Sequence, residues 1–340
     1  MLADLPLSSP TLFAPMQGVS TAGVRDLVAH LGRPGMMCVP FVRVTAIRPS
    51  VKWLLTQVHR TENIPLCAQL LGNHAEHLAF AASVLSHAGA SCIDLNLGCP
   101  TERANKKGVG AALLTRLDHI RHIVESMRAA CTCKLSVKIR ASEGDIEDSE
   151  RVAQTIEAAG ADFIVVHPRK RSQCYDGVAD WSIVKRLKSS LRIAVVGNGD
   201  LWYAADAVRL MRESGANAVM LGRPALRNPF IFRQIEELCA GSAPYVPTGE
   251  DIVQHIQRLA ERARMDLAER ERGPEGAVKE QIQFLLRAVP EPLRSELWQS
   301  TMHALTLDEI VSALTPLREA TELDLAADGP MRFEKAPVSP

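Results

Sequence analysis

Short apolar segments recur along the first two thirds of the chain, and each is about as long as a buried strand. We count eight of them, at fairly regular spacing. Continuously apolar strands are typical of a parallel sheet whose outer face is covered by other elements. The segments are LFAPM (12–16), MMCVPFV (36–42), LCAQLLG (66–72), CIDLNLG (92–98), LSVKIR (135–140), FIVVHPR (163–169), IAVVGNG (193–199) and AVMLGR (218–223).

Helical periodicity fills the stretches between these segments. It is clearest over residues 75–89, 117–130, 149–160 and 204–215, and several of these stretches end in glycine, a common helix stop. Strands that alternate with helices favour the α/β class, and eight such units predict a (β/α)₈ TIM barrel.

The pattern changes after residue 240. Residues 240–250 form a linker rich in glycine, proline and serine, and the chain beyond it has helical periodicity without strand-like runs. We therefore expect a barrel domain over residues 1–241, a small helical domain over 250–320 and a flexible tail over 321–340. The expected helices of the second domain span 250–270, 277–289, 292–300 and 307–317.

The composition excludes several classes of protein. Of 340 residues, 46% are hydrophobic and 23% are charged, as in an ordinary globular protein. The longest apolar runs fall far short of the ~20 residues that span a bilayer, and residues 1–15 lack the features of a secretory signal. We expect no membrane contact and a cytoplasmic location. Cys131 and Cys133 form a CxC pair without further ligands at zinc spacing, so we expect no metal site.

The zero net charge argues mildly against a nucleic-acid partner, but it hides an uneven distribution. Residues 1–249 carry 28 Lys+Arg against 22 Asp+Glu, whereas residues 250–320 carry 9 against 13. The basic surplus lies in two loops that follow the fourth and sixth strands, at the barrel face where enzymes keep their active sites. These loops contain Arg103, Lys106, Lys107, Arg169, Lys170 and Arg171.

Polar residues at the carboxyl ends of the expected strands are candidates for function, because a barrel strand is otherwise apolar. The strand alternation predicts that they converge on one mouth. The candidates are Gln17, Gln69, Asn96, Cys99, Lys138, Arg140, His167, Arg169, Asn198, Asp200, Gly222 and Arg223.

Two turns after the last strands, GNGD (197–200) and LGRP (221–224), have the composition of a phosphate site. Glycine lets backbone N–H groups approach a phosphate, and Arg223 can add a charged donor. The alternative is that these are ordinary turns.

Cys99 lies just past a strand, before proline and a glycine-containing segment. The alternative interpretation, a small buried apolar residue, fits Cys38, Cys67, Cys92 and Cys239 better. The basic residues near Cys99 favour chemistry at the thiol, and composition leaves open whether it acts as nucleophile or proton donor.

An ordered series of motifs in this chain resembles the tRNA-dihydrouridine synthase family. The series runs through the whole barrel, and a helical domain after a linker is also found in that family. FVRV (41–44) is similar to the bacterial C subgroup. The motifs are APM (14–16), AQLLG (68–72), DLNLGCP (94–100), KKGVGAALL (106–114), VKIR (137–140), VVHPR (165–169), GNGD (197–200) and MLGRPAL (220–226).

The resemblance implies non-covalent FMN at the barrel mouth, with NADPH as its reductant. Pro15 and Met16 would contact the flavin ring, Gln69 and Lys138 would bond its polar edge, and His167 would lie near flavin and substrate. The ribityl phosphate would be held by Asn198, Gly199, Asp200, Gly222 and Arg223.

The resemblance also implies the reaction. Hydride would pass from the reduced flavin N5 to C6 of a uridine in the D-loop of tRNA, and Cys99 would give a proton to C5. Asn96 would orient the uracil, the helical domain would help to bind tRNA, and the enzyme would act as a monomer. RNA and substrate contacts are expected at Asn96, Arg103, Lys106, Lys107, Arg140, Arg169 and Lys170.

Two departures from the family pattern put the target nucleotide in question: Pro40, where an acidic residue is usual, and HPRKR (167–171). A second hypothesis is an FMN-dependent barrel oxidoreductase that acts on a free pyrimidine or another small molecule, similar to dihydroorotate dehydrogenases. A third is an RNA-binding protein without turnover. The helical domain and the basic loops favour the tRNA enzyme over the second hypothesis.

Overall fold

Eight parallel strands form a closed barrel and follow one another around it in chain order. The structure is a computed structural model that describes residues 2–58, 63–265, 273–320 and 323. The predicted (β/α)₈ barrel is confirmed, and each strand falls on one of the eight apolar segments. The strands are β1 (Thr11–Phe13), β2 (Met36–Arg43), β3 (Leu66–Leu71), β4 (Cys92–Leu97), β5 (Lys134–Ala141), β6 (Phe163–Lys170), β7 (Ala194–Asn198) and β8 (Ala218–Leu221).

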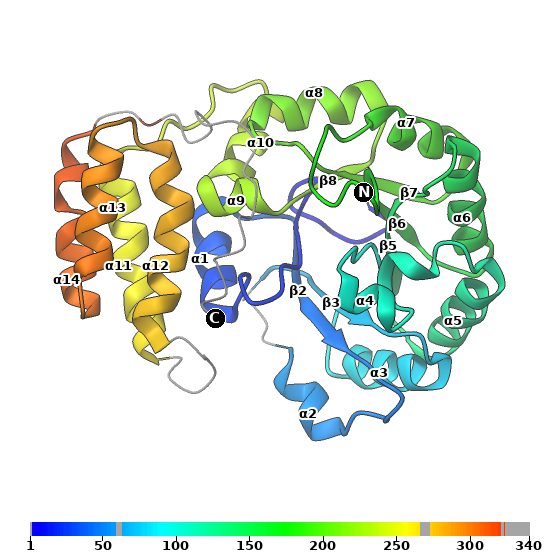
Figure 1. Cartoon of the computed structure of the whole chain (residues 1–340). Coiled ribbons are helices and arrows are strands. Elements are labelled where there is room, and N and C mark those ends of the chain that lie inside the picture. The colour runs from blue at the N-terminus through cyan, green and yellow to red at the C-terminus, as the bar shows by residue number, and fades with distance from the viewer. Residues whose placement is uncertain (1, 59–62, 266–272, 321–322, 324–340) are drawn as a thin grey trace. The chain divides into compact units, whose positions relative to one another are not determined.

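Helices alternate with the strands, and Figure 1 shows α3, α5, α6, α7 and α8 around the outside of the barrel. The helices predicted over residues 75–89, 117–130, 149–160 and 204–215 are present. The helical elements of this part of the chain are α1 (Ala22–Gly32), α2 (Val51–Thr56), α3 (Ala75–His87), α4 (Glu102–Lys106), the 3₁₀ helix η1 (Gly110–Leu113), α5 (Leu117–Ala130), α6 (Ile146–Ala158), α7 (Trp181–Ser190) and α8 (Ala204–Ser214).

The strands are buried on both faces, which explains their uninterrupted apolar sequence. Cys38, Cys67 and Cys92 face one another across three neighbouring strands and belong to the apolar core, as predicted. Cys239 was predicted to be buried with them, and this is wrong: it is exposed at the end of α10 (Ile231–Cys239). The last residue of a helix can be exposed to solvent, and composition alone does not show that Cys239 stands at such a position.

Pro40 lies where the pairing of β2 with β3 shifts register, between Val39 and Val42. Proline has no N–H to give to a strand ladder, and a bulge is one of the places where a sheet tolerates it. The residue that departs from the family pattern therefore coincides with an irregularity in the strand pairing.

The chain divides into two compact units. One contains residues 1–222 and 232–244, and the other contains residues 223–231 together with the chain from residue 245 onward. The sequence-based domain boundaries at residues 241 and 250 stay a prediction. Part of the predicted helix 250–270 and nearly all of the predicted tail 321–340 lie outside the described residues.

The second unit is helical in the part that the structure describes. Short α9 belongs to it although it directly follows β8 in sequence. Its elements are α9 (Arg223–Arg227), α11 (Gly249–Met265), α12 (Gly273–Leu285), η2 (Leu286–Ala288), α13 (Leu293–His303), α14 (Leu307–Ala313) and η3 (Thr315–Glu319). Across the described ranges, no helix has both the length and the apolar character that crossing a bilayer requires.

Candidate active site

Hydrogen bonds connect polar side chains of three adjacent strands inside the barrel. Gln69 on β3 donates from Nε2 to Asp94 Oδ2 at 2.8 Å, and Asn96 on β4 donates from Nδ2 to Gln69 Oε1, also at 2.8 Å. Ser136 on β5 donates to Asp94 Oδ1 at 2.6 Å. Gln69, Asp94, Asn96 and Ser136 are all buried. The barrel therefore brings two predicted site residues, Gln69 and Asn96, into direct contact.

The backbone of the loop after β4 is held on several sides, and this fixes Cys99. Asn96 Oδ1 accepts hydrogen bonds from the N–H groups of Gly98 and Cys99, both at 3.0 Å. The carbonyl of Cys99 accepts from Ala111 N–H at 3.1 Å. Gly110 has a φ of +65°, and a Cβ there would lie 2.9 Å from the Cβ of Cys99. Only glycine fits at that position.

The Cys99 thiol is half-buried, with Sγ 3.4 Å from Thr101 Oγ1. It differs from Cys38, Cys67 and Cys92, which are enclosed in the barrel core. A thiol that is held by its backbone yet partly accessible can meet a ligand above the barrel.

Burial shifts the pKa of two groups on neighbouring strands in opposite senses. It raises the pKa of the Asp94 carboxyl to about 6, although hydrogen bonds from Ser136 and Gln69 oppose this. It lowers the pKa of the Lys138 ammonium to about 8, with a further contribution from Arg140 and an opposing one from Asp94. A half-buried ammonium whose pKa is lowered favours a polar or anionic ligand.

The Lys138 ammonium should make stability depend on pH. Its pKa is 10.5 in the unfolded chain and about 8 in the folded chain, so between these values the unfolded state binds more protons and the free energy of unfolding rises with pH. Below pH 8 the half-buried charge costs about 3 kcal/mol of folding free energy. In urea unfolding of ligand-free protein, Lys138→Met should be more stable than wild type at pH 7, and the gain should largely vanish at pH 10.5. Lys185→Met, at an exposed position, should show no such change, and a gain equal at both pH values would contradict the prediction.

Arg140 joins two loops at the mouth. Its side chain is buried, Nε donates to Gly98 O at 2.8 Å, and Nη1 donates to Cys174 O at 2.6 Å. The guanidinium carbon of Arg140 lies 5.4 Å from the centre of the Tyr175 ring. The centre of that ring lies 6.4 Å from the centre of the His167 ring. Sequence reasoning missed Tyr175, because an aromatic residue in an irregular loop carries no periodic signal. Its half-exposed ring can stack on a planar ligand.

Arg169, near the end of β6, and Asp200, just after β7, form an ion pair whose guanidinium is buried and whose carboxylate is half-buried. The Arg169 side chain is 2% exposed, and its Nη2 lies 2.7 Å from both carboxylate oxygens of Asp200. Its Nε donates to Asp176 O, and its Nη1 lies 3.3 Å from His167 Nε2. Every nitrogen of the guanidinium therefore has a partner within the protein, and the expected contact of Arg169 with RNA stays a prediction.

The loops after β1, β7 and β8 lie close together. Met16 Sδ lies 3.2 Å from where a Cβ on Gly222 would stand, so glycine permits this approach. Gly199 has a φ of +115°, and its carbonyl accepts from Trp181 Nε1 at 3.0 Å. Asn198 donates from Nδ2 to Met220 O at 2.7 Å. The Asp200 carboxylate turns toward Arg169, and phosphate binding by this turn stays a prediction.

A family model described as dihydrouridine synthase matches residues 12–315 of the chain. The chain belongs to the dihydrouridine synthase family. The match confirms the resemblance seen in the motifs, and it extends from β1 into the helices of the second unit.

Relatives of this dihydrouridine synthase family member occur in several bacteria. A probable tRNA-dihydrouridine synthase from Rhodobacter capsulatus is 33% identical and covers 94% of this chain and 98% of its own. A tRNA-dihydrouridine(16) synthase from Cupriavidus necator is also 33% identical, over 69% of this chain and 76% of its own. A tRNA-dihydrouridine synthase B from Pasteurella multocida is 30% identical, over 74% and 78%.

Among solved structures, a DHODH in complex with ferulenol from Eimeria tenella is similar to this synthase family member. It has a TM-score of 0.50 and 14% sequence identity, and covers 73% of this chain and 81% of its own. Identity this low shows a shared fold alone.

The predicted loop cations of this family member differ in accessibility. Arg103, Lys106 and Lys107 are exposed, and Lys106 lies 2.6 Å from Glu102, its neighbour on α4. Lys170 is half-buried and donates from Nζ to the carbonyls of Glu143 and Gly144 at 2.9 Å. Arg103 and Lys107 are therefore well suited to meet a polyanion.

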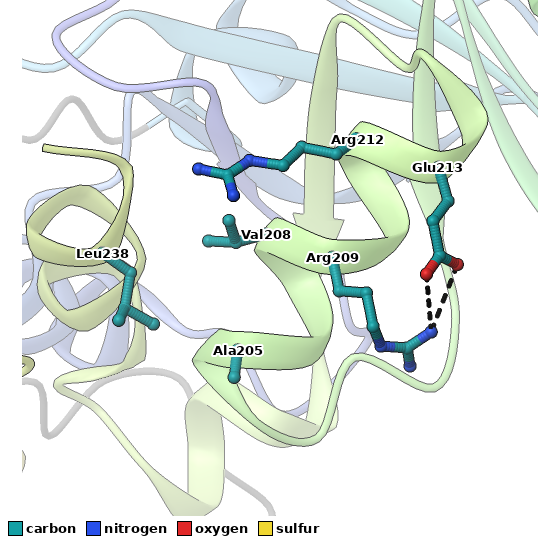
Figure 2. Close-up of a pocket in the computed structure, with 6 residues that line it drawn as sticks. All are labelled: Ala205, Val208, Arg209, Arg212, Glu213 and Leu238. Carbon is teal, nitrogen blue, oxygen red and sulfur yellow. Dashed lines mark hydrogen bonds and ion pairs between the residues drawn. The ribbon is translucent and has the colours of Figure 1, made fainter. Parts of the chain in front are cut away.

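A cavity of about 390 Å³ between α8 and α10 is lined by none of the predicted site residues, and Figure 2 shows Arg209 paired with Glu213 on one side of it and Leu238 on the other. Within the described ranges, no group of three or more His, Cys, Asp or Glu side chains is placed to hold a metal ion.

Proposed function

We propose that this chain is a flavin-dependent tRNA-dihydrouridine synthase that reduces the C5–C6 bond of a uridine in tRNA. The observation that carries the proposal is the fixed, half-buried Cys99 thiol above a polar set formed by Gln69, Asn96 and Lys138, in a member of this family. The tRNA substrate is suggested by the names of the relatives. The flavin is suggested by the motifs.

The residues at the mouth offer hydrogen-bond donors of the kind that the ring edge and the phosphate of FMN require. Lys138 and Gln69 offer donors for the polar edge of a flavin ring, and Gln69 keeps one N–H beyond the one it gives to Asp94. The space beside Gly222 that a Cβ would fill, next to Met16, lets backbone N–H groups come close to a phosphate. Pro15, His167 and Arg223 complete the proposed set. When bound, the reduced flavin supplies the hydride equivalent.

The chain's own residues orient the uracil and move one proton. Asn96 and Arg140 position the base, while Tyr175 offers a face for it to stack on. Cys99 Sγ gives its proton to C5 on the face opposite the flavin, and the resulting thiolate is reprotonated from solvent. Cysteine thiols are mostly protonated at neutral pH, which suits a proton donor.

The uridine must leave the RNA stack to reach this site, because the C5–C6 bond is otherwise covered by neighbouring bases. Cations on the surrounding loops then hold the flanking phosphates. We assign this role to Arg103, Lys106, Lys107 and Lys170, and we assign tRNA binding also to the helical unit. NADPH as reductant, a D-loop uridine as target, a monomeric enzyme and a cytoplasmic location belong to the same proposal.

Two measurements test the proposal directly. Purified protein should show FMN absorbance that NADPH bleaches, and tRNA from cells that lack the gene should lose dihydrouridine at one mapped position. Restoring the gene should restore the modification. A colourless protein that does not take up FMN contradicts the flavin. A yellow protein that reduces a free pyrimidine but leaves tRNA unmodified favours the small-molecule alternative.

The loop cations should contribute to tRNA affinity through counterion release. Replacing Arg103 and Lys107 together with alanine should weaken tRNA binding and reduce the salt slope of log K by about one for each phosphate that the variant no longer neutralises. Titrations at several salt concentrations measure this. Replacing the exposed Lys185, on the outer helix α7, with alanine is a matched control and should change neither quantity. An unchanged slope in the double variant would place the RNA elsewhere.

A further inference from the structure

Asp94 begins a chain of hydrogen bonds that runs to the backbone of Cys99. Asp94 Oδ2 accepts from Gln69 Nε2, Gln69 Oε1 accepts from Asn96 Nδ2, and Asn96 Oδ1 accepts from the N–H groups of Gly98 and Cys99. Each of these bonds is 2.8 to 3.0 Å long. Sequence reasoning singled out Gln69, Asn96 and Cys99 and gave Asp94 no role.

The groups at the two ends of this series of hydrogen bonds require the same orientation of the Gln69 and Asn96 amides. A carboxylate can only accept, so Gln69 must turn its NH₂ group toward Asp94 and its oxygen toward Asn96. Backbone N–H groups can only donate, so Asn96 must turn its oxygen toward Gly98 and Cys99. Reversal of either amide would bring two donors or two acceptors together in a buried site, which is costly.

We propose that Asp94 is a positioning residue for Cys99, acting through the fixed orientation of the Gln69 and Asn96 amides. It touches neither substrate nor flavin. The carboxylate sets the direction of the amide chain, and the amide chain holds the loop that carries the thiol. This inference rests on the proposed function only for its catalytic consequence.

Ser136 explains which substitution the site tolerates. Its hydroxyl donates to Asp94 Oδ1 and lies 3.4 Å from Cys92 Sγ, so it can rotate and accept instead. In Asp94→Asn the amide oxygen can face Gln69 while the NH₂ group donates to Ser136. The Gln69 and Asn96 amides then keep their orientations. Asp94→Ala instead removes the acceptor that fixes the orientation of Gln69.

Alkylation of Cys99 by iodoacetamide tests the proposal on flavin-free protein without substrate. Peptide mass spectrometry follows each thiol, and the exposed Cys239 is an internal reference. Asp94→Ala should raise the Cys99 rate about tenfold, as expected when the loop loses about one net hydrogen bond. Asp94→Asn should stay within about twofold of wild type. An unchanged rate in Asp94→Ala overturns the proposal.

Two further variants separate positioning from a general loosening of the barrel. Ser136→Ala removes the other partner of the carboxylate but keeps its bond to Gln69, so Cys99 alkylation should stay within about twofold of wild type. A rise equal to that of Asp94→Ala overturns the proposal.

Gln69→Met should raise the Cys99 alkylation rate as Asp94→Ala does, and the double variant of Asp94→Ala with Gln69→Met should show no further rise. Additive effects would show that Asp94 does not act through Gln69. If Asp94→Ala does not fold, Gln69→Met alone decides, and an unchanged rate there overturns the proposal.

Kinetics on tRNA provide a second readout. Asp94→Ala should lower kcat about tenfold and leave KM for tRNA unchanged, because the carboxylate lies inside the barrel and away from the RNA. Equal losses in Asp94→Ala and Asp94→Asn would overturn the proposal. If wild-type protein forms no dihydrouridine, the proposed function fails, while the alkylation series still decides whether Asp94 positions Cys99.

Discussion

Replacing Cys99 with alanine should lower the rate of dihydrouridine formation at least ~100-fold, the scale that one positioned general acid contributes. The fold should be unaffected. Alanine keeps the Cβ against which Gly110 packs, and the backbone bonds to Asn96 and Ala111 do not involve the thiol. The variant should therefore still bind FMN, and single-turnover formation of dihydrouridine in tRNA measures the loss.

A matched control separates this effect from the loss of any thiol. Cys239→Ala removes an exposed cysteine from the end of α10, far along the chain from the mouth, and should leave the rate unchanged. Wild-type turnover in Cys99→Ala would contradict the role of Cys99 as proton donor. Loss of flavin together with activity would show instead that the residue supports cofactor binding.

Replacing Asp200 with asparagine should lower the free energy of unfolding by about 3 kcal/mol, the scale for removal of one partner from a buried ion pair. The Arg169 guanidinium is 2% exposed and would keep its charge without the carboxylate. Asp200 Oδ2 also accepts from Ala179 N–H at 2.7 Å, and if the asparagine oxygen keeps that bond, its NH₂ group faces the Arg169 guanidinium, which can only donate. Urea unfolding of the flavin-free protein measures the effect.

The control is an exposed pair on the same barrel. Asp206 lies 3.1 Å from Arg209 on α8, and the two side chains are 32% and 54% exposed. Asp206→Asn should change stability by less than about 0.5 kcal/mol, because water screens such pairs. An effect of similar small size in Asp200→Asn would mean that the pair of Arg169 with Asp200 adds little to stability.

Several expectations about the mouth depended on which way a side chain turns. The sequence places Arg169 and Asp200 at the ends of neighbouring strands, and we assigned one to RNA and the other to a phosphate. The structure pairs them with each other, which the sequence did not predict. Residues 31 positions apart meet only because the barrel sets their strands side by side, and strand pattern does not reveal such partners.

The sequence by itself determined the eight strands, the helices between them, the change to a helical region and the family, because these follow from local period, segment length and ordered motifs. Tertiary structure alone decided which polar groups meet: Gln69 with Asp94 and Asn96, Arg140 with the loop of Tyr175, and Arg169 with Asp200. Strand register and barrel closure fix these contacts. Buried polar groups then take whichever partner lies within hydrogen-bond reach, because leaving one unpaired is costly.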